Sequence, residues 1–353
     1  MRIGLIAENI LERLALALGF VPTPLGETLL GSMVSQAIMV STKLGVFEAL
    51  ASSPLSAQEV AMCCDTYPSV TEKLLNVLVS AKLLKASGSR YSLSAVARKW
   101  LLKTSPQSLY DSMLLGLVEA ELIAGLEDFI CKGKSLDIHA KISKSENSKE
   151  LWSVYQQGMH SRARLAANEV AYRTKVPKGA RQMLDIGGSH GYYSVALCQR
   201  YPNLRSVILD LPEAVEQSAP IVAKAGMGNR VTHWAGNVLT EDLGQNTYDL
   251  VFISQLVHHF DETSNRQLTQ RIAQALRPGG ALVVQELIRR QGANQGGQTG
   301  YIMDLFFALT SDAGTWSFEE IASWQQDAGL KPDKPLWLRF QPSVGQQTAI
   351  KPS

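Results

Sequence analysis

A histidine and a glutamate are the side chains of this sequence best suited to move a proton. His258 follows the apolar run 249–254, and Glu286 ends the apolar run 281–286. If these runs are neighbouring strands, the two side chains meet over one edge of a sheet. A carboxylate that accepts from one imidazole nitrogen fixes the tautomer and leaves the other nitrogen to act as a base. The alternative is structural, with the histidine capping a helix and the glutamate facing solvent.

A glycine-rich turn after another apolar run is suited to seat a ligand. Asp185 lies in the run 183–186, and Gly187, Gly188 and Gly191 follow it just before a predicted helix. Strand, glycine turn and helix form the nucleotide-binding corner of a doubly wound sheet. Glycine permits the sharp bend and lets a ligand lie against the backbone.

The turn does not match the dinucleotide-binding pattern. Ser189 and Tyr192 occupy the places of the second and third glycines of that pattern, counted from Gly187. NAD is therefore not the favoured ligand. An ordinary tight turn remains the structural alternative.

Two further strand ends carry polar groups. Asp210 comes 19 residues after Gly191 and is placed to accept hydrogen bonds from a ribose diol, although it also precedes a helix that it could cap. Gly236 and Asn237 follow the run 231–235, where the asparagine amide is suited to an adenine edge. Since open α/β sheets bind ligands beyond the carboxyl ends of their strands, these groups are expected to share one crevice.

Alternating strands and helices must position these residues. From residue 183 onward, apolar runs typical of strands covered on both faces alternate with amphipathic segments typical of helices. The predicted strands are 183–186, 206–210, 231–235, 249–254 and 281–286, and the predicted helices are 193–201, 212–225 and 264–276. The pattern predicts an α/β Rossmann-like doubly wound sheet. Residues 336–340 and 347–351 predict an antiparallel pair at one sheet edge, with Gly345 in the turn.

The first hundred residues predict a separate domain, which we describe as an all-helical winged-helix domain with a hairpin wing. Helices are predicted at 29–51, 60–64 and 68–84, and a hairpin at 86–93. A winged helix raises DNA binding as a rival function. The predicted recognition helix and the residue that follows it carry only four charged residues, too few for a basic outer face, which favours packing or dimerisation instead.

Helices are also predicted at 108–131 and 150–175, with a surface loop at 133–148 between them. Met159, on the second of these helices, is a candidate to face a ligand. Core packing explains the same methionine without a ligand.

Length and composition restrict the number of domains and the classes of function to be considered. The 353 residues suggest two domains, 1–105 and 106–353, and the net charge of +2 argues against nucleic acid or a membrane surface as the main partner. The amphipathic first residues are not typical of a signal peptide, and no long apolar stretch predicts a membrane span. Four cysteines without metal or disulfide spacing indicate no metal site and a reducing cytoplasm.

Taken together, the motifs resemble those of the class I S-adenosylmethionine-dependent O-methyltransferases. The similar group is the two-domain small-molecule family of plant caffeate and acetylserotonin O-methyltransferases, with bacterial relatives in natural-product pathways. The resemblance rests on the ordered set of motifs, covers nearly the whole chain, and includes the N-terminal dimerisation domain. The motifs are Leu-Asp-Ile-Gly-Gly at 184–188, Asp-Leu-Pro at 210–212, Gly-Asn at 236–237, His258 and Arg-Pro-Gly-Gly at 277–280.

The resemblance implies transfer of a methyl group from S-adenosylmethionine to a hydroxyl of a small aromatic substrate of the natural-product type, leaving S-adenosylhomocysteine. It implies that His258 is the general base, that Glu286 supports it, and that the chain forms a homodimer through its N-terminal domain. The implied cofactor-binding residues are Asp185, Gly187, Gly188, Gly191, Asp210, Leu211, Gly236, Asn237 and Ser254. The implied substrate-binding residues are Met159, His259, Met303 and Phe307.

Four residues depart from the family pattern. Ser189 replaces a glycine, Asn237 replaces the usual aspartate at the adenine position, and His259 stands where an acidic residue is common. Thr315 falls where a second supporting glutamate is expected. These departures leave methylation of nitrogen or carbon open. They also leave open a non-methylating reaction such as hydroxylation, decarboxylation or cyclisation.

Overall fold

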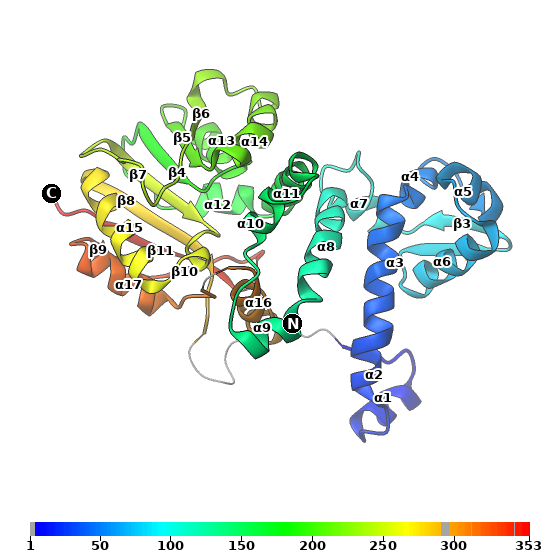
Figure 1. The fold of residues 1–353 in the computed structure, drawn as a ribbon. Coiled ribbons are helices and arrows are strands. Elements are labelled where there is room, and N and C mark those ends of the chain that lie inside the picture. Colours follow the sequence, from blue (N-terminus) through cyan, green and yellow to red (C-terminus); the bar gives the residue numbers. More distant parts are fainter. Residues whose placement is uncertain (1–3, 291–296, 312, 342) are drawn as a thin grey trace. The chain divides into compact units, whose positions relative to one another are not determined.

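The computed structural model describes residues 4–290, 297–311, 313–341 and 343–353. The chain divides into two compact units, Met1–Ala120 and Glu121–Ser353, which are described separately (Figure 1). The domain boundary expected after residue 105 lies inside the first unit, between α7 (Ala95–Trp100) and α8 (Tyr110–Ile123).

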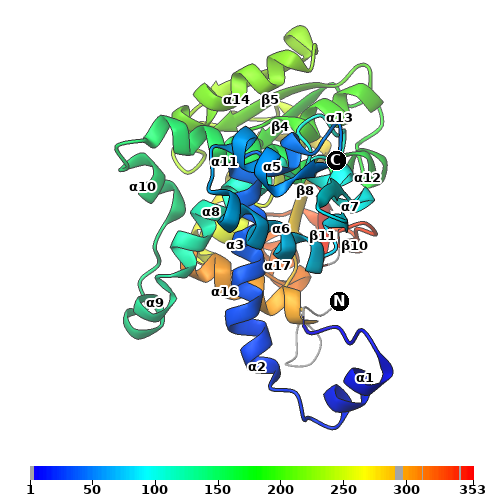
Figure 2. The same ribbon diagram turned by 90° about the vertical axis from the view of Figure 1, so that its right-hand side faces the viewer.

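A continuous helical run dominates the start of unit 1. After α1 (Ile10–Ala17), three segments follow one another without a break: α2 (Thr23–Leu25), a π-helical turn (Gly26–Leu30) and α3 (Gly31–Lys43). Figure 2 shows this run as one nearly straight helix. Gly45, with φ 80°, ends it before α4 (Val46–Ala49), because glycine adopts this left-handed conformation without a steric penalty. The prediction of one helix over 29–51 is therefore wrong.

The rest of unit 1 contains the predicted hairpin. β2 (Leu84–Ser87) and β3 (Arg90–Leu93) pair antiparallel around Gly88, and β1 (Leu55–Ser56) pairs with the other side of β3. The unit is thus not all-helical. The helices α5 (Ala57–Cys64) and α6 (Pro68–Ser80) precede the hairpin, and Ser56 and Glu59 form a capping box at the start of α5. The core of the unit includes Phe47, Leu50, Val60, Leu75 and Leu78.

The sheet of unit 2 confirms the doubly wound prediction. The strand order is β10-β11-β8-β7-β4-β5-β6, with β9 also paired to β11. The five strands from β4 to β8 are parallel, and β11 is antiparallel to β8. The strands are β4 (Gln182–Ile186), β5 (Arg205–Asp210), β6 (Val231–Ala235), β7 (Tyr248–Ser254), β8 (Leu276–Leu287), β9 (Lys331–Pro332), β10 (Leu336–Trp337) and β11 (Val344–Ile350).

The predicted antiparallel pair near the C-terminus is confirmed with one correction. β11 begins at Val344, so Gly345 lies within the strand and not in the turn. A Cβ on Gly345 would lie 2.4 Å from the Phe318 ring, so the glycine allows that ring to pack on the strand. β11 is also interior to the sheet, because β9 and β10 pair with its outer side.

Helices cover both faces of this sheet, as Figure 1 shows. α12 (Ala167–Arg173), α13 (Tyr192–Arg200) and α14 (Pro212–Lys224) share one buried cluster with the sheet. α15 (Glu262–Ala275) and α17 (Phe318–Asp327) share the other. The two apolar layers explain why the central strands read as continuous hydrophobic runs.

The segment before β4 differs from its prediction. The expected helix 108–131 is broken near Gly125 into α8 and α9 (Leu126–Lys132), and the expected helix 150–175 is divided into α11 (Ser148–Ala163) and α12. The expected surface loop 133–148 contains α10 (Ile138–Ser143), which is capped by Asp137. Its residues Ile138 and Ile142, one turn apart, are buried. Across the described residues, no helix is long and apolar enough to cross a membrane.

Candidate active site

The strand order reverses at the carboxyl ends of β4 and β7. The chain leaves β4 toward β5 on one side, whereas β7 pairs with the other side of β4. Ligands of open α/β sheets bind where the order reverses in this way. The glycine turn after β4 and the segment after β7 meet here, since a Cβ on Gly187 would lie 2.9 Å from the Leu256 side chain.

The histidine and glutamate predicted to meet do so in the structure. His258 lies in a 3-10 turn (Val257–His259) after β7, and its Nδ1 is 3.0 Å from Oε1 of Glu286 in β8. Both side chains are almost fully buried. An ionised carboxylate only accepts hydrogen bonds, so Nδ1 donates to it and Nε2 carries the lone pair. The pair therefore has the geometry of an oriented imidazole base.

Gln255 is a third member of this cluster that the sequence did not reveal. Its backbone has a φ of 55°, which is uncommon for a residue with a side chain. In the amide orientation that satisfies both neighbours, its nitrogen donates to Glu286 Oε1 at 3.0 Å and its oxygen accepts from Leu287 N at 3.1 Å. The amide thus bonds both to the Glu286 carboxylate and to the backbone of the next residue.

Aromatic rings and imidazoles surround His258. Phe307 of α16 (Gly297–Thr310) stacks on the His258 ring, with centroids 3.7 Å apart and planes 7° apart. His259 lies 4.3 Å from the His258 ring and 4.8 Å from the His139 ring. His139 Nε2 is 3.1 Å from the Tyr155 hydroxyl. Two predicted substrate residues, His259 and Phe307, are therefore placed beside the base.

Burial keeps the neighbouring imidazoles neutral. It lowers the pKa of His139 to about 4, and it lowers the pKa of His259 well below the usual value, with smaller contributions from the other histidines. His139 was missed because the segment 133–148 was interpreted as a loop, whereas Tyr155 lies in the helix predicted over 150–175 but was not singled out as a site residue. The signal that identifies α10 is the N-cap Asp137 followed by an apolar pair four residues apart.

The glycine turn is shaped by close packing. Gly187 and Gly191 have φ values of 67° and 69°. A Cβ on Gly191 would lie 2.5 Å from Val222, so only glycine fits at the start of α13. Gly188 packs directly against the carboxyl group of Asp185. The turn therefore keeps its backbone close to the carboxyl ends of the strands.

Two carboxyl groups at this turn suit a cationic ligand. Asp185 is buried, and its Oδ2 accepts from Ser194 at 2.5 Å, whereas Oδ1 has no hydrogen-bond partner among the described residues. Burial, together with the nearby Asp210, raises the pKa of Asp185 to about 7. Burial also raises the pKa of Asp210 to about 6, although its Oδ1 accepts from Leu211 N at 2.8 Å. A positively charged ligand with hydrogen-bond donors would stabilise both ionised groups.

The raised pKa of Asp185 predicts a pH dependence of stability. A carboxyl group whose pKa is higher in the folded state stabilises the fold fully below its unfolded pKa, and this contribution is lost as the pH rises through about 7. We expect Asp185→Asn to gain thermal stability relative to the wild type between pH 4 and pH 8, in the absence of ligands. Each pKa unit corresponds to about 1.4 kcal/mol. Parallel melting curves for both proteins over this range would contradict the assignment.

The other predicted cofactor residues lie along the same edge. Ser254 ends β7 and accepts from Gln285 Nε2 at 2.9 Å, and Gly236 N donates to Asp210 O at 2.9 Å. Asn237 is exposed, and its Oδ1 accepts from Leu239 N at 2.9 Å, which stabilises the turn after β6. Met159 on α11 and Met303 on α16 are half-buried.

Two further departures from the family pattern, Ser189 and Thr315, also have hydrogen-bond partners. The Ser189 hydroxyl donates to the buried Gln156 of α11, which ties the glycine turn to that helix. The Ser189 backbone has a φ of 32°, so it keeps a conformation that glycine adopts more easily. Thr315 donates two hydrogen bonds to the carboxylate of Asp304 on α16.

The fold and the arrangement at its switch point define a class I methyltransferase fold. The chain belongs to the O-methyltransferase family, because the profile of the O-methyltransferase domain matches residues 132–331, more than half of the chain. Residues 27–103 match the O-methyltransferase dimerisation domain. The resemblance predicted from the sequence is thereby confirmed.

Relatives support this assignment over most of the chain. The chain is 24% identical to 3-hydroxy-5-methyl-1-naphthoate 3-O-methyltransferase of Streptomyces sahachiroi, covering 94% of this chain and 95% of the relative. It is 26% identical to an N,N-dimethyltransferase of Streptomyces rimosus, covering 84% and 87%. The crystal structure of human N-acetylserotonin methyltransferase in complex with SAM has the same fold, with a TM-score of 0.81, 20% identity and coverage of 98% and 99%.

Proposed function

We propose that the protein transfers a methyl group from S-adenosylmethionine to a hydroxyl of a small aromatic molecule, with His258 as the general base. The observation that carries the proposal is the buried His258–Glu286 pair, set beside the glycine turn where the strand order reverses. Bound at this turn, S-adenosylmethionine would supply an electrophilic methyl group on a sulfonium.

The residues at the turn fit that cofactor. Its positive charges match the carboxyl groups of the buried Asp185 and the half-buried Asp210, and its ribose diol offers donors to Asp210. The unpartnered Oδ1 of Asp185 is an acceptor that such a ligand would satisfy. Gly187, Gly188, Gly191, Leu211, Gly236, Asn237 and Ser254 complete the proposed cofactor site.

The proposed base acts on the acceptor hydroxyl. Nε2 of His258 takes the proton of the hydroxyl as its oxygen attacks the methyl group, and Glu286 stabilises the imidazolium that forms. A positioned base contributes about 10²–10⁴ in rate, and alignment of the two reactants contributes about 7–11 kcal/mol. Positioning is therefore the larger part of the catalysis.

The surroundings of His258 favour a flat aromatic acceptor. Phe307 and the neutral ring of His259 offer stacking surfaces, and Met159 and Met303 are proposed to complete the pocket. An aromatic hydroxyl acceptor also agrees with the name of the naphthoate relative. The N,N-dimethyltransferase relative makes nitrogen acceptors the alternative to test.

Methyl transfer to a set of matched acceptors tests the proposal. Purified protein would be incubated with methyl-labelled S-adenosylmethionine and pairs of aromatic compounds that carry either a hydroxyl or an amine at one position. Label in an aryl methyl ether supports the proposal. Label in the amines but not in their hydroxyl partners would overturn the choice of acceptor atom.

We further propose a cytoplasmic homodimer formed through unit 1. All four cysteines are free thiols, two of them exposed, which agrees with a reducing compartment. The helix α1 and the helical run of unit 1 expose large apolar side chains that a second copy would cover. They are Leu11, Leu14, Leu29, Leu30 and Met33.

Substitution of these exposed apolar residues by lysine is expected to dissociate the dimer. Leu30 and Met33 are 56% and 59% exposed, and burial of such a side chain contributes about 1.5–3 kcal/mol. The double variant Leu30→Lys and Met33→Lys should raise the dimer dissociation constant by at least about 100-fold. Light scattering would measure it, with Met62→Lys on α5 as the control. A dimer that persists in the double variant but dissociates in the control would place the interface elsewhere.

A further inference from the structure

Helix α16 carries two side chains whose positions are linked. Phe307 stacks on the imidazole of His258. Asp304 lies three residues earlier on the same helix, and residues three apart are neighbours on one helix face. Whatever fixes Asp304 therefore also limits the movement of Phe307 over the base.

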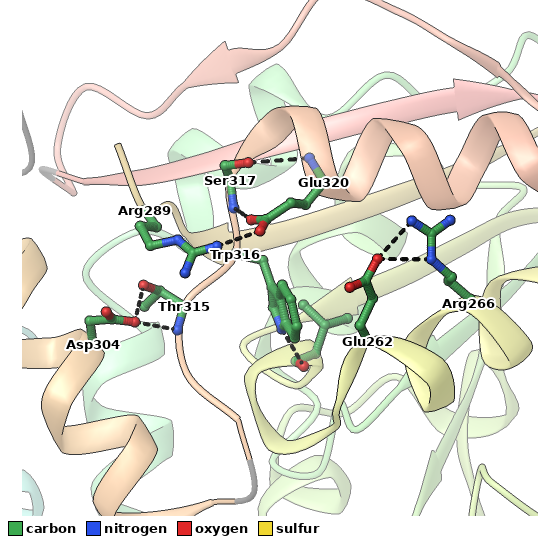
Figure 3. A network of polar contacts seen from close by, with 9 residues as sticks. Glu262, Arg266, Arg289, Asp304, Thr315, Trp316, Ser317 and Glu320 are labelled. Carbon is green, nitrogen blue, oxygen red and sulfur yellow. Dashed lines mark hydrogen bonds and ion pairs between the residues drawn. The ribbon is translucent and has the colours of Figure 1, made fainter. Parts of the chain in front are cut away.

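Thr315 binds Asp304 through two groups. Its backbone N and its hydroxyl both donate to Asp304 Oδ1, at 2.7 Å and 2.5 Å (Figure 3). Hydrogen bonds to a carboxylate are about twice as strong as those between neutral groups. A Cβ on the preceding Gly314 would lie 3.0 Å from the same oxygen, so the glycine allows this close approach.

The residues after Thr315 are anchored beside the base and just beyond the end of β8. Trp316 Nε1 donates to the carbonyl oxygen of Val257, the residue before His258, at 3.0 Å. Arg289 N donates to Trp316 O at 2.9 Å, and the Arg289 side chain pairs with Glu320 at the start of α17 (Figure 3). The segment that holds Asp304 is therefore anchored to the same turn that carries the base.

We propose that Asp304 and Thr315 form a clamp that holds Phe307 against His258, so that Asp304 is a positioning residue for the base. Thr315 occupies the place where the family pattern has a second supporting glutamate. In this chain the carboxylate comes from α16, and it acts on the base through the helix and the Phe307 ring. The inference rests on the proposed function for its kinetic test.

A double-mutant cycle tests whether Asp304 acts through Phe307. Asp304→Ala is expected to lower kcat by about 10-fold and to change the acceptor KM less than 3-fold, because alignment of the base is lost while the pocket remains. Thr315→Val, which keeps the backbone donor, should lower kcat by about 3-fold, and Thr315→Ser should restore it. In a Phe307→Ala background, Asp304→Ala should have no further effect.

The control is Thr310→Val on the same helix, since the Thr310 hydroxyl bonds only within α16, to Phe306 O at 2.8 Å, in the described structure. It should leave kcat and the acceptor KM unchanged. Multiplicative losses in the double variant of Asp304 and Phe307 would overturn the proposal, as would an Asp304→Ala enzyme with wild-type kcat.

Amide hydrogen exchange separates this inference from the proposed function, because it needs no turnover. Asp304→Ala and Thr315→Val are expected to speed exchange in residues 304–310, whereas Thr310→Val is not expected to do so outside its own turn. Unchanged exchange in both clamp variants would overturn the clamp even if methyl transfer is observed. If exchange is faster in both clamp variants but the wild type transfers no methyl group, the clamp is supported and the proposed function is wrong.

Discussion

Replacing His258 with alanine is expected to lower kcat by about 10²–10⁴-fold while the affinity for S-adenosylhomocysteine changes less than about 3-fold. The base is buried in the turn after β7 and is not itself a proposed cofactor contact; those contacts lie in the glycine turn and at the ends of β5, β6 and β7. The substitution therefore removes the proton acceptor and leaves the cofactor site intact. Steady-state kinetics and calorimetry measure the two quantities.

Chemical rescue sharpens this prediction. The alanine variant leaves a space the size of an imidazole between Phe307 and Glu286, both of which contact the native ring. Added imidazole should therefore raise the rate of the variant and have no effect on the wild type. Wild-type turnover in the variant without imidazole would refute the assignment of His258.

Glu286→Gln is expected to lower kcat by about 10²–10³-fold with little change in fold. The glutamine keeps the shape of the side chain, but its amide can present a donor where Nδ1 of His258 also donates. The imidazole then loses both its preferred tautomer and the charge that stabilises its protonated form during the reaction.

A matched control is available on α15. Glu262 also forms an ion pair, with Arg266 at 2.7 Å, but it is about half exposed and lies away from the buried pair. Glu262→Gln should retain wild-type kcat. If Glu286→Gln behaves like this control, Glu286 has only a structural role.

The sheet and the central pair were predictable because both follow from local patterns. Continuous apolar runs identify strands covered on both faces, and the carboxyl ends of adjacent parallel strands bring His258 and Glu286 together. The glycine turn was predictable for the same reason, since Gly187 and Gly191 adopt conformations that side chains disfavour.

The parts that were not predicted depend on contacts between distant segments. Asp304 gives no signal in the sequence, because its partner Thr315 lies eleven residues away, beyond the end of α16. Gln255 looks like an ordinary polar residue until its amide is seen beside Glu286. α10 was missed because a six-residue helix offers only one apolar pair, Ile138 and Ile142, to distinguish it from a loop.

The most direct test of the central claim is the single-turnover rate of methyl transfer to an aromatic hydroxyl, measured with cofactor already bound. We predict an aryl methyl ether as the product of the wild type. We predict a rate at least 100-fold lower in His258→Ala at equal cofactor occupancy. Equal rates in the two proteins would contradict the account.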